Sequence, residues 1–110
     1  MIKSIVTAYR KPGLTREEYN KYWLEQHAPL AARLIPGVRR YVQNHLVEIP
    51  GMEYEEDGVV EMWYDDVESW QKSIKYIRSP EAKVLAEDAA KFCDLQRKVN
   101  QWIVQEHVII

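Results

Sequence analysis

The stretch that most constrains the fold runs from residue 10 to residue 44. Within it, residues 15–18 (TREE) form a capping box, because the first hydroxyl can accept from an amide three residues later while the glutamate reaches back. A helix therefore begins here, and the Pro-Gly pair at 36–37 ends it. Residues 2–9 and 38–47 on either side are rich in β-branched and aromatic side chains, which predicts a strand before the helix and another after it.

The rest of the chain supplies a strand, a helix and a strand. Residues 58–64 (GVVEMWY) predict the third strand, close enough to the second to form a hairpin. Asp65 or Asp66 can cap a second helix, which breaks and restarts at residues 79–81 (SPE). Residues 100–110 have the β-branched content of a fourth strand that runs to the last residue.

This order, β-α-β-β-α-β, predicts one domain over residues 1–110 of the α+β class. The expected architecture is ferredoxin-like, an antiparallel four-stranded sheet with two helices on one face. The other face of such a sheet is bare, and the strands carry large apolar residues on both parities, including Trp63, Trp102 and Ile103. We therefore expect the bare face to pack on a second copy of the chain in a homodimer.

Charge, hydropathy and cysteine content exclude several classes of function. The 15 basic and 17 acidic residues give a net charge of −2, so no nucleic-acid partner is expected. No apolar run has the length of a membrane span and the first residues do not resemble a signal peptide, so we expect a cytoplasmic protein with no membrane partner. Cys93 is the only cysteine, and no Cys or His cluster has metal-ligand spacing. Neither a metal nor a cofactor is expected.

The first helix carries the residues that suggest chemistry. Tyr22, Trp23, Gln26 and His27 fall at three-and-four spacing, so they share one side of the helix. Pro29 removes an amide from the helix and predicts a kink beside His27. Imidazole exchanges protons near neutral pH, which makes His27 the candidate catalytic residue. The alternative is a packed histidine that hydrogen-bonds a carbonyl freed by the kink.

If His27 takes a proton next to a carbonyl or from a phenol, a donor must hold the developing oxyanion. Arg40 and Asn44 share a strand parity, so they can serve together only if that parity faces the helices. A pocket for an apolar molecule also needs aromatic walls. The predicted binding residues are the candidate donors Tyr22, Gln26, Arg40 and Asn44 and the candidate walls Trp23 and Trp63.

Several segments together resemble the EthD family. They include a turn followed by a capping box, an H-A-P-L element, and a P-G-x-R-R-Y element that starts the second strand. Each is weak alone, but the combination at these separations is specific and covers nearly the whole chain. The segments are residues 10–19 (RKPGLTREEY), 25–30 (EQHAPL), 36–41 (PGVRRY), 58–66 (GVVEMWYDD) and 79–81 (SPE).

The resemblance implies a dimeric α/β barrel, in which two ferredoxin-like sheets close face to face, with ligands between each sheet and its helices. It places the family's histidine at His27. Relatives serve in ether degradation and aromatic polyketide pathways, so we expect a small hydrophobic or aromatic ligand in a catabolic or secondary-metabolite pathway. The chemistry would be cofactor-independent proton transfer of an isomerase, dehydratase or cyclase. The alternatives are a cofactor-free oxidoreductase (monooxygenase) and a non-catalytic metabolite-binding accessory protein.

Overall fold

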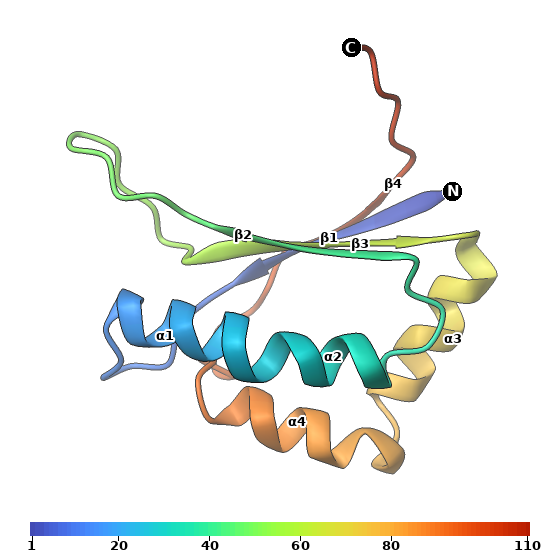
Figure 1. Ribbon diagram of the computed structural model, residues 1–110, viewed down its shortest axis with the longest axis horizontal. Coiled ribbons are helices and arrows are strands. Elements are labelled where there is room, and N and C mark those ends of the chain that lie inside the picture. The colour runs from blue at the N-terminus through green and yellow to red at the C-terminus, as the bar shows by residue number, and fades with distance from the viewer.

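The chain forms a four-stranded sheet with helices on one side, as the computed structural model of residues 1–110 shows (Figure 1). All strand pairs are antiparallel, in the order β2-β3-β1-β4. The α+β class and the βαββαβ order expected from the sequence are confirmed. The elements are β1 (Ile2–Ala8), α1 (Arg16–Tyr22), a π-helical turn (Trp23–His27), α2 (Ala28–Leu34), β2 (Arg40–His45), β3 (Gly58–Tyr64), α3 (Val67–Ile77), a 3₁₀ turn (Pro80–Ala82), α4 (Lys83–Ala90) and β4 (Gln101–Val104).

The register of the sheet decides which side chains face the helices. Lys3 lies opposite Trp63, and Trp63 lies opposite Arg40, so these three side chains share one face. Gln43 has the other parity on β2, and its Nε2 donates to the backbone carbonyl of Trp23 over 3.1 Å. The Gln43 face therefore packs on the helices, and the Arg40 face is left uncovered.

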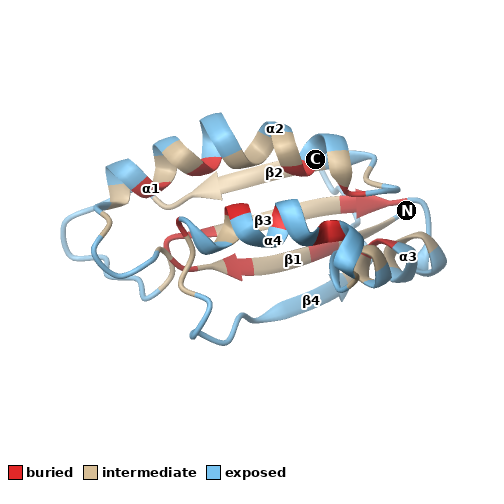
Figure 2. Cartoon of the chain, turned by 90° about the horizontal axis from the view of Figure 1, so that it is seen from below, coloured by how far each residue is buried: buried red, intermediate tan, exposed pale blue.

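Two small clusters of buried side chains join the helices to the sheet. The first connects the start of the helical segment to the end of the α4 region, and the second connects α2 to α4. Figure 2, which views the molecule from the helix side, shows buried positions on β1, β3 and the helices, whereas β4 is almost entirely exposed. The clusters are Tyr19, Trp23 and Phe92, and Ala31, Ile35 and Leu85.

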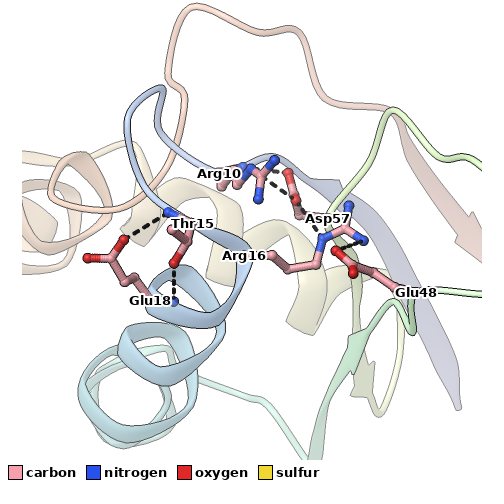
Figure 3. A network of polar contacts seen from close by, with 6 residues as sticks. All are labelled: Arg10, Thr15, Arg16, Glu18, Glu48 and Asp57. Atoms are coloured by element: carbon pink, nitrogen blue, oxygen red, sulfur yellow. Dashed lines mark hydrogen bonds and ion pairs between the residues drawn. The ribbon is translucent and has the colours of Figure 1, made fainter.

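The predicted capping signals are confirmed at three helix ends. The Thr15 hydroxyl accepts from the Glu18 amide over 3.1 Å, and the Glu18 carboxylate accepts from the Thr15 amide over 3.0 Å (Figure 3). Asp66 accepts from the Ser69 amide at the start of α3. Gly37 follows α2 with a φ of +79°, a left-handed conformation that favours glycine.

The expected kink at Pro29 takes the form of a π-helical turn that precedes it. Pro29 itself sits in the first turn of α2, where its missing N–H costs least. Because Pro29 cannot donate to the helix, the ladder shifts by one residue, and the Ala28 amide donates to the carbonyl of Trp23, five residues back. The irregularity therefore lies at Trp23–His27, the stretch that contains the Glu25 carbonyl left without a donor by Pro29 and that ends at His27.

A buried carboxylate ties the end of the β2–β3 connection to the start of α1 (Figure 3). Asp57 accepts from the backbone amide of Arg10 over 2.9 Å and from Nε of Arg16 over 3.2 Å. Glu48, at the other end of the connection, lies 3.6 Å from the same Arg16 guanidinium. The connection is thus anchored at both ends although its tip reaches solvent.

Two segments project from the sheet on its uncovered side, namely the β2–β3 connection and the C-terminal residues 105–110 (Figure 1). The prediction of a strand over 100–110 is wrong beyond Val104. In the antiparallel ladder Val104 pairs with Lys3, so β1 has almost ended and residues 105–110 have no strand beside them in this chain. The second strand is also shorter than the predicted 38–47.

Candidate functional site

His27 lies at the end of the π-helical turn and faces α4. Its Nδ1 is 2.8 Å from Oδ2 of Asp88, and its ring lies against Phe92 with 4.9 Å between centroids. The side chain retains 15% of its accessible surface. His27 is therefore held between two helical segments, and the acidic partner comes from 61 residues later in the chain.

Asp88 is shared by two donors. The Tyr22 hydroxyl donates to Oδ1 over 2.5 Å, while His27 occupies Oδ2. Burial disfavours the charged carboxylate, yet the hydrogen bonds from Tyr22 and His27 outweigh it and hold the pKa of Asp88 below its ordinary value. The same bond, together with burial, raises the pKa of Tyr22 to about 12. Asp88 is thus an ionised acceptor between two fixed donors.

This arrangement sets the tautomer of His27. An ionised carboxylate can only accept, so Nδ1 carries a proton, and in the neutral imidazole Nε2 is the nitrogen with the lone pair. Nε2 makes no hydrogen bond within the chain. The imidazole lines a cavity of about 210 Å³ whose other walls are all apolar. These walls are Ile77, Ala82, Leu85, Ala86 and Ala89.

The cavity beside His27 lies among the helices, and no strand residue lines it. The cleft expected between sheet and helices is filled near β2 by the indole of Trp23, which stacks on His45 with 4.5 Å between ring centroids. Gln43 connects its two neighbours on the helix-facing side of β2. Its side chain accepts from Nε2 of His45 and donates to the Tyr41 hydroxyl, both over 2.8 Å. Burial lowers the pKa of His45, so its ring is neutral.

The side chains of the predicted site residues on the first helix point in three different directions. Tyr22 joins His27 through Asp88, as described above. Trp23 is buried and points toward the sheet, where it stacks on His45. Gln26 is exposed and borders a shallow surface hollow. Only Tyr22 and His27 are therefore brought together.

Arg40, Asn44 and Trp63 are not brought to His27, because their strand parity faces away from the helices. The Asn44 amide donates to Glu61 over 2.9 Å, and Trp63 donates from Nε1 to Glu106 over 3.2 Å. The Arg40 guanidinium lies 4.7 Å from the Trp63 ring centroid. The seven residues predicted for one site are thus not all brought together, since the sheet itself separates these three from the helix.

Sequence reasoning missed Asp88, the carboxylate that holds His27 beside Phe92. A signal for it was present, because Asp88 lies three residues after Leu85 and four before Phe92 on the apolar side of the second helical region. A carboxylate on an apolar helix face requires a buried donor. That requirement indicates a polar partner on the facing helix.

Other chemical groups offer no second candidate centre. Burial raises the pKa of the Cys93 thiol to about 12, which keeps it protonated. No group of three or more His, Cys, Asp or Glu side chains is arranged to hold a metal ion. No helix has the length and apolar character needed to cross a bilayer.

Two solved structures that are similar to the chain are described as an EthD family protein and an EthD-like protein. An ethyl tert-butyl ether D (EthD) family protein from Bacillus halodurans is 30% identical, with a TM-score of 0.68 and coverage of 97% of this chain and 100% of that one. An EthD-like protein from Ralstonia eutropha is 19% identical, with a TM-score of 0.70 and coverage of 99% and 94%.

A third similar structure concerns the fold alone. A dimeric protein of unknown function with a ferredoxin-like fold, from Bacteroides fragilis, is 14% identical, with a TM-score of 0.62 and coverage of 96% of this chain and 95% of that one. No curated protein matches the chain.

The family comparison covers most of the sequence. The EthD domain model matches residues 11–96, which include the capping box, the π-helical turn and Asp88. This match and the 30% identity to the Bacillus halodurans protein agree with the resemblance found in the sequence motifs. The chain is a member of the EthD family.

Proposed function

We propose that this EthD protein binds a small hydrophobic or aromatic metabolite in the cavity beside His27 and that His27 exchanges a proton with it. The observation that carries the proposal is the combination of an apolar cavity with an imidazole whose Nδ1 is held by Asp88 and whose Nε2 is free. A histidine held in this way is the usual form of a general base. The reaction class is therefore isomerisation, dehydration or cyclisation.

The size and lining of the cavity support a ligand of fragment size. A volume of about 210 Å³ is below the range of roughly 300–1,000 Å³ that is typical of pockets for drug-sized ligands. Ala82, Ala86 and Ala89 keep the space open with the smallest apolar side chains, while Leu85 and Ile77 supply apolar area. A single ring with few polar substituents suits such a space.

Native mass spectrometry of freshly purified protein tests the proposal. Wild type should carry or take up one small aromatic molecule per subunit, and His27→Ala should lose it. Ala86→Phe should also lose it, because Ala86 lines the cavity and is exposed, so a larger side chain can fill the cavity without entering the core. Gln26→Ala is the matched control, since its exposed side chain lies outside the cavity.

The contrary result is equally clear. If a panel of single-ring compounds binds wild type and Ala86→Phe equally, or binds neither, the cavity is not the ligand site. If a ligand binds and is released unchanged in kinetic assays with wild type, the protein is a non-catalytic binding protein of the same site.

We also propose a homodimer that forms through the uncovered face of the sheet. Trp102 lies on this face opposite Ile5 and remains 51% exposed, which is unusual for a tryptophan in a strand. Lys3 on the same face bridges Glu61 and Glu106, each over 2.7 Å, so this cation is already paired with carboxylates before a second copy covers it. The two projecting segments flank this face (Figure 1). The Bacteroides fragilis relative, of similar fold, is dimeric.

A further inference from the structure

The cavity beside His27 contains only one polar side chain, and this restricts the ligands that it can ionise. All other lining side chains are aliphatic. The backbone offers no free donor from Ala82 either, because its amide donates to the Ser79 carbonyl over 3.1 Å. A ligand that loses a proton here therefore finds no oxyanion hole, which simple ketones and esters require.

The protonated base is well supported, in contrast. When Nε2 gains a proton, the imidazolium is already paired with the Asp88 carboxylate at 2.8 Å. Tyr22 occupies the second carboxylate oxygen, so the carboxylate cannot turn away from His27. The site therefore stabilises the imidazolium that proton transfer forms but offers no hydrogen-bond donor for the ligand anion. A suitable ligand must delocalise its own negative charge.

On the basis of the function proposed above, we propose that Asp88 is a positioning residue for His27 and that the pair deprotonates small phenols, whose anions spread their charge over the ring. In this step the phenol O–H bond breaks, its electron pair remains on oxygen, and a new N–H bond forms at Nε2. The phenolate then lies beside the imidazolium, which is its only charged partner. The proton returns to the ligand when it leaves.

The experiment uses 4-nitrophenol, because its phenolate absorbs at longer wavelength than its neutral form. 4-Nitroanisole is the matched ligand, since it has nearly the same shape but no acidic proton. Wild type should bind 4-nitrophenol with the phenolate spectrum at a pH where the free compound is neutral. It should bind 4-nitroanisole without a spectral change and at least tenfold more weakly.

Asp88→Asn is the decisive variant. The asparagine amide can donate to Nδ1, which moves the imidazole proton to Nε2 and removes the base without changing the cavity walls. The variant should bind 4-nitroanisole within about twofold of wild type, lose the phenolate spectrum, and bind 4-nitrophenol at least tenfold more weakly. Lys91→Gln is the control, because it removes an exposed charge 4.0 Å from Oδ1 of Asp88 and keeps both the Asp88 carboxylate and its bond to His27.

A direct measurement of the tautomer keeps the proposal testable even if Asp88→Asn does not fold. Nitrogen chemical shifts of labelled histidine in wild type should show His27 protonated at Nδ1, with signals assigned through His45→Gln and His107→Gln. A proton on Nε2 in the free protein would overturn the proposal.

The binding results also separate this inference from the function on which it rests. Binding of both ligands without ionisation, or a phenolate spectrum that survives in Asp88→Asn, overturns the role of Asp88 but leaves the cavity as a ligand site. Failure of wild type to bind either compound overturns both.

Discussion

The indole of Trp23 lies parallel to the imidazole of His45, with 4.5 Å between the ring centroids and 7° between the planes. This stack joins the π-helical turn to the edge strand β2, and the Gln43 amide bonds the carbonyl of Trp23 beside it. The turn that carries His27 is therefore fixed from the sheet side as well as from α4. The precision of the His27 position depends on both attachments.

Gly58 makes room for this stack. A Cβ atom added there would lie 2.6 Å from both the Asn44 carbonyl oxygen and the Trp23 ring. Gly58→Ala should therefore lower the free energy of unfolding by about 2–3 kcal/mol, a typical cost of overpacking, in urea titrations. Gly51→Ala is the comparison, because it has open space and only its φ of +85° opposes a side chain, at about 1 kcal/mol. An equal effect of the two substitutions would contradict the packing argument.

Asp57 should contribute more to stability than the other acidic residues of the β2–β3 connection. Asp57→Asn weakens its bonds to the Arg10 amide and to the Arg16 guanidinium, both at a buried carboxylate. We expect a loss of about 1.5–3 kcal/mol in the free energy of unfolding. Glu55→Gln removes a solvent-exposed pair with Arg97 and should change stability by about 0.5 kcal/mol or less. Comparable losses would mean that Asp57 is effectively solvated.

Asp88 should make stability depend on pH in the acid range. Its pKa in the folded protein lies below the ordinary value of 3.8, so folding favours the ionised carboxylate. This contribution is present above the unfolded-state pKa and is lost as the pH falls through the folded-state pKa. The difference in unfolding free energy between wild type and Asp88→Asn should therefore be about 2 kcal/mol at pH 7 and shrink as the pH falls through the folded-state pKa of Asp88. Urea titrations across this range measure it. A difference that grows on acidification would reverse the assigned sign.

The proposed dimer can be broken by a charge on the uncovered face. Trp102→Glu replaces an exposed tryptophan of the proposed contact with a carboxylate and should raise the dimer dissociation constant at least tenfold, as analytical ultracentrifugation can measure. Leu24→Glu is the matched control, since Leu24 is 59% exposed on the π-helical turn, away from that face. Dissociation by Leu24→Glu alone would move the interface to the helices.

Local signals in the sequence were enough to predict most of the strands and helix ends. The third strand, Gly58–Tyr64, has the predicted bounds, and the caps at Thr15 and Asp66 form as expected. These features depend on neighbours within four residues, which a sequence displays directly. The predicted length of the C-terminal strand is wrong because that length depends on where the partner strand β1 ends. The paired residues of the two strands lie about a hundred residues apart along the chain.

The candidate site was predicted only in part, for a related reason. Helical periodicity placed Trp23 and His27 on one side, but the π-helical turn between them directs the first to the sheet and the second to α4. Strand alternation showed that Arg40 and Asn44 lie on the same face of the sheet, but it did not show whether that face is the one covered by the helices. Asp88 completes the site from another helix, so only the folded chain reveals it.

The π-helical turn is also a one-residue frame shift within a single helical segment. It allows the buried residues before it to pack against the sheet and those after it to pack against α4. Deletion of Leu24, whose side chain meets mainly solvent, would remove the extra residue and restore ordinary helical pitch, with the turns before and after it nearly in phase. His27 would then stay near Asp88 while Trp23 stayed near His45. The same deletion in a regular stretch of α2 would instead rotate everything after it by about 100°. The π-helical turn is thus the place in this helix where a residue can be lost without moving the imidazole away from its carboxylate.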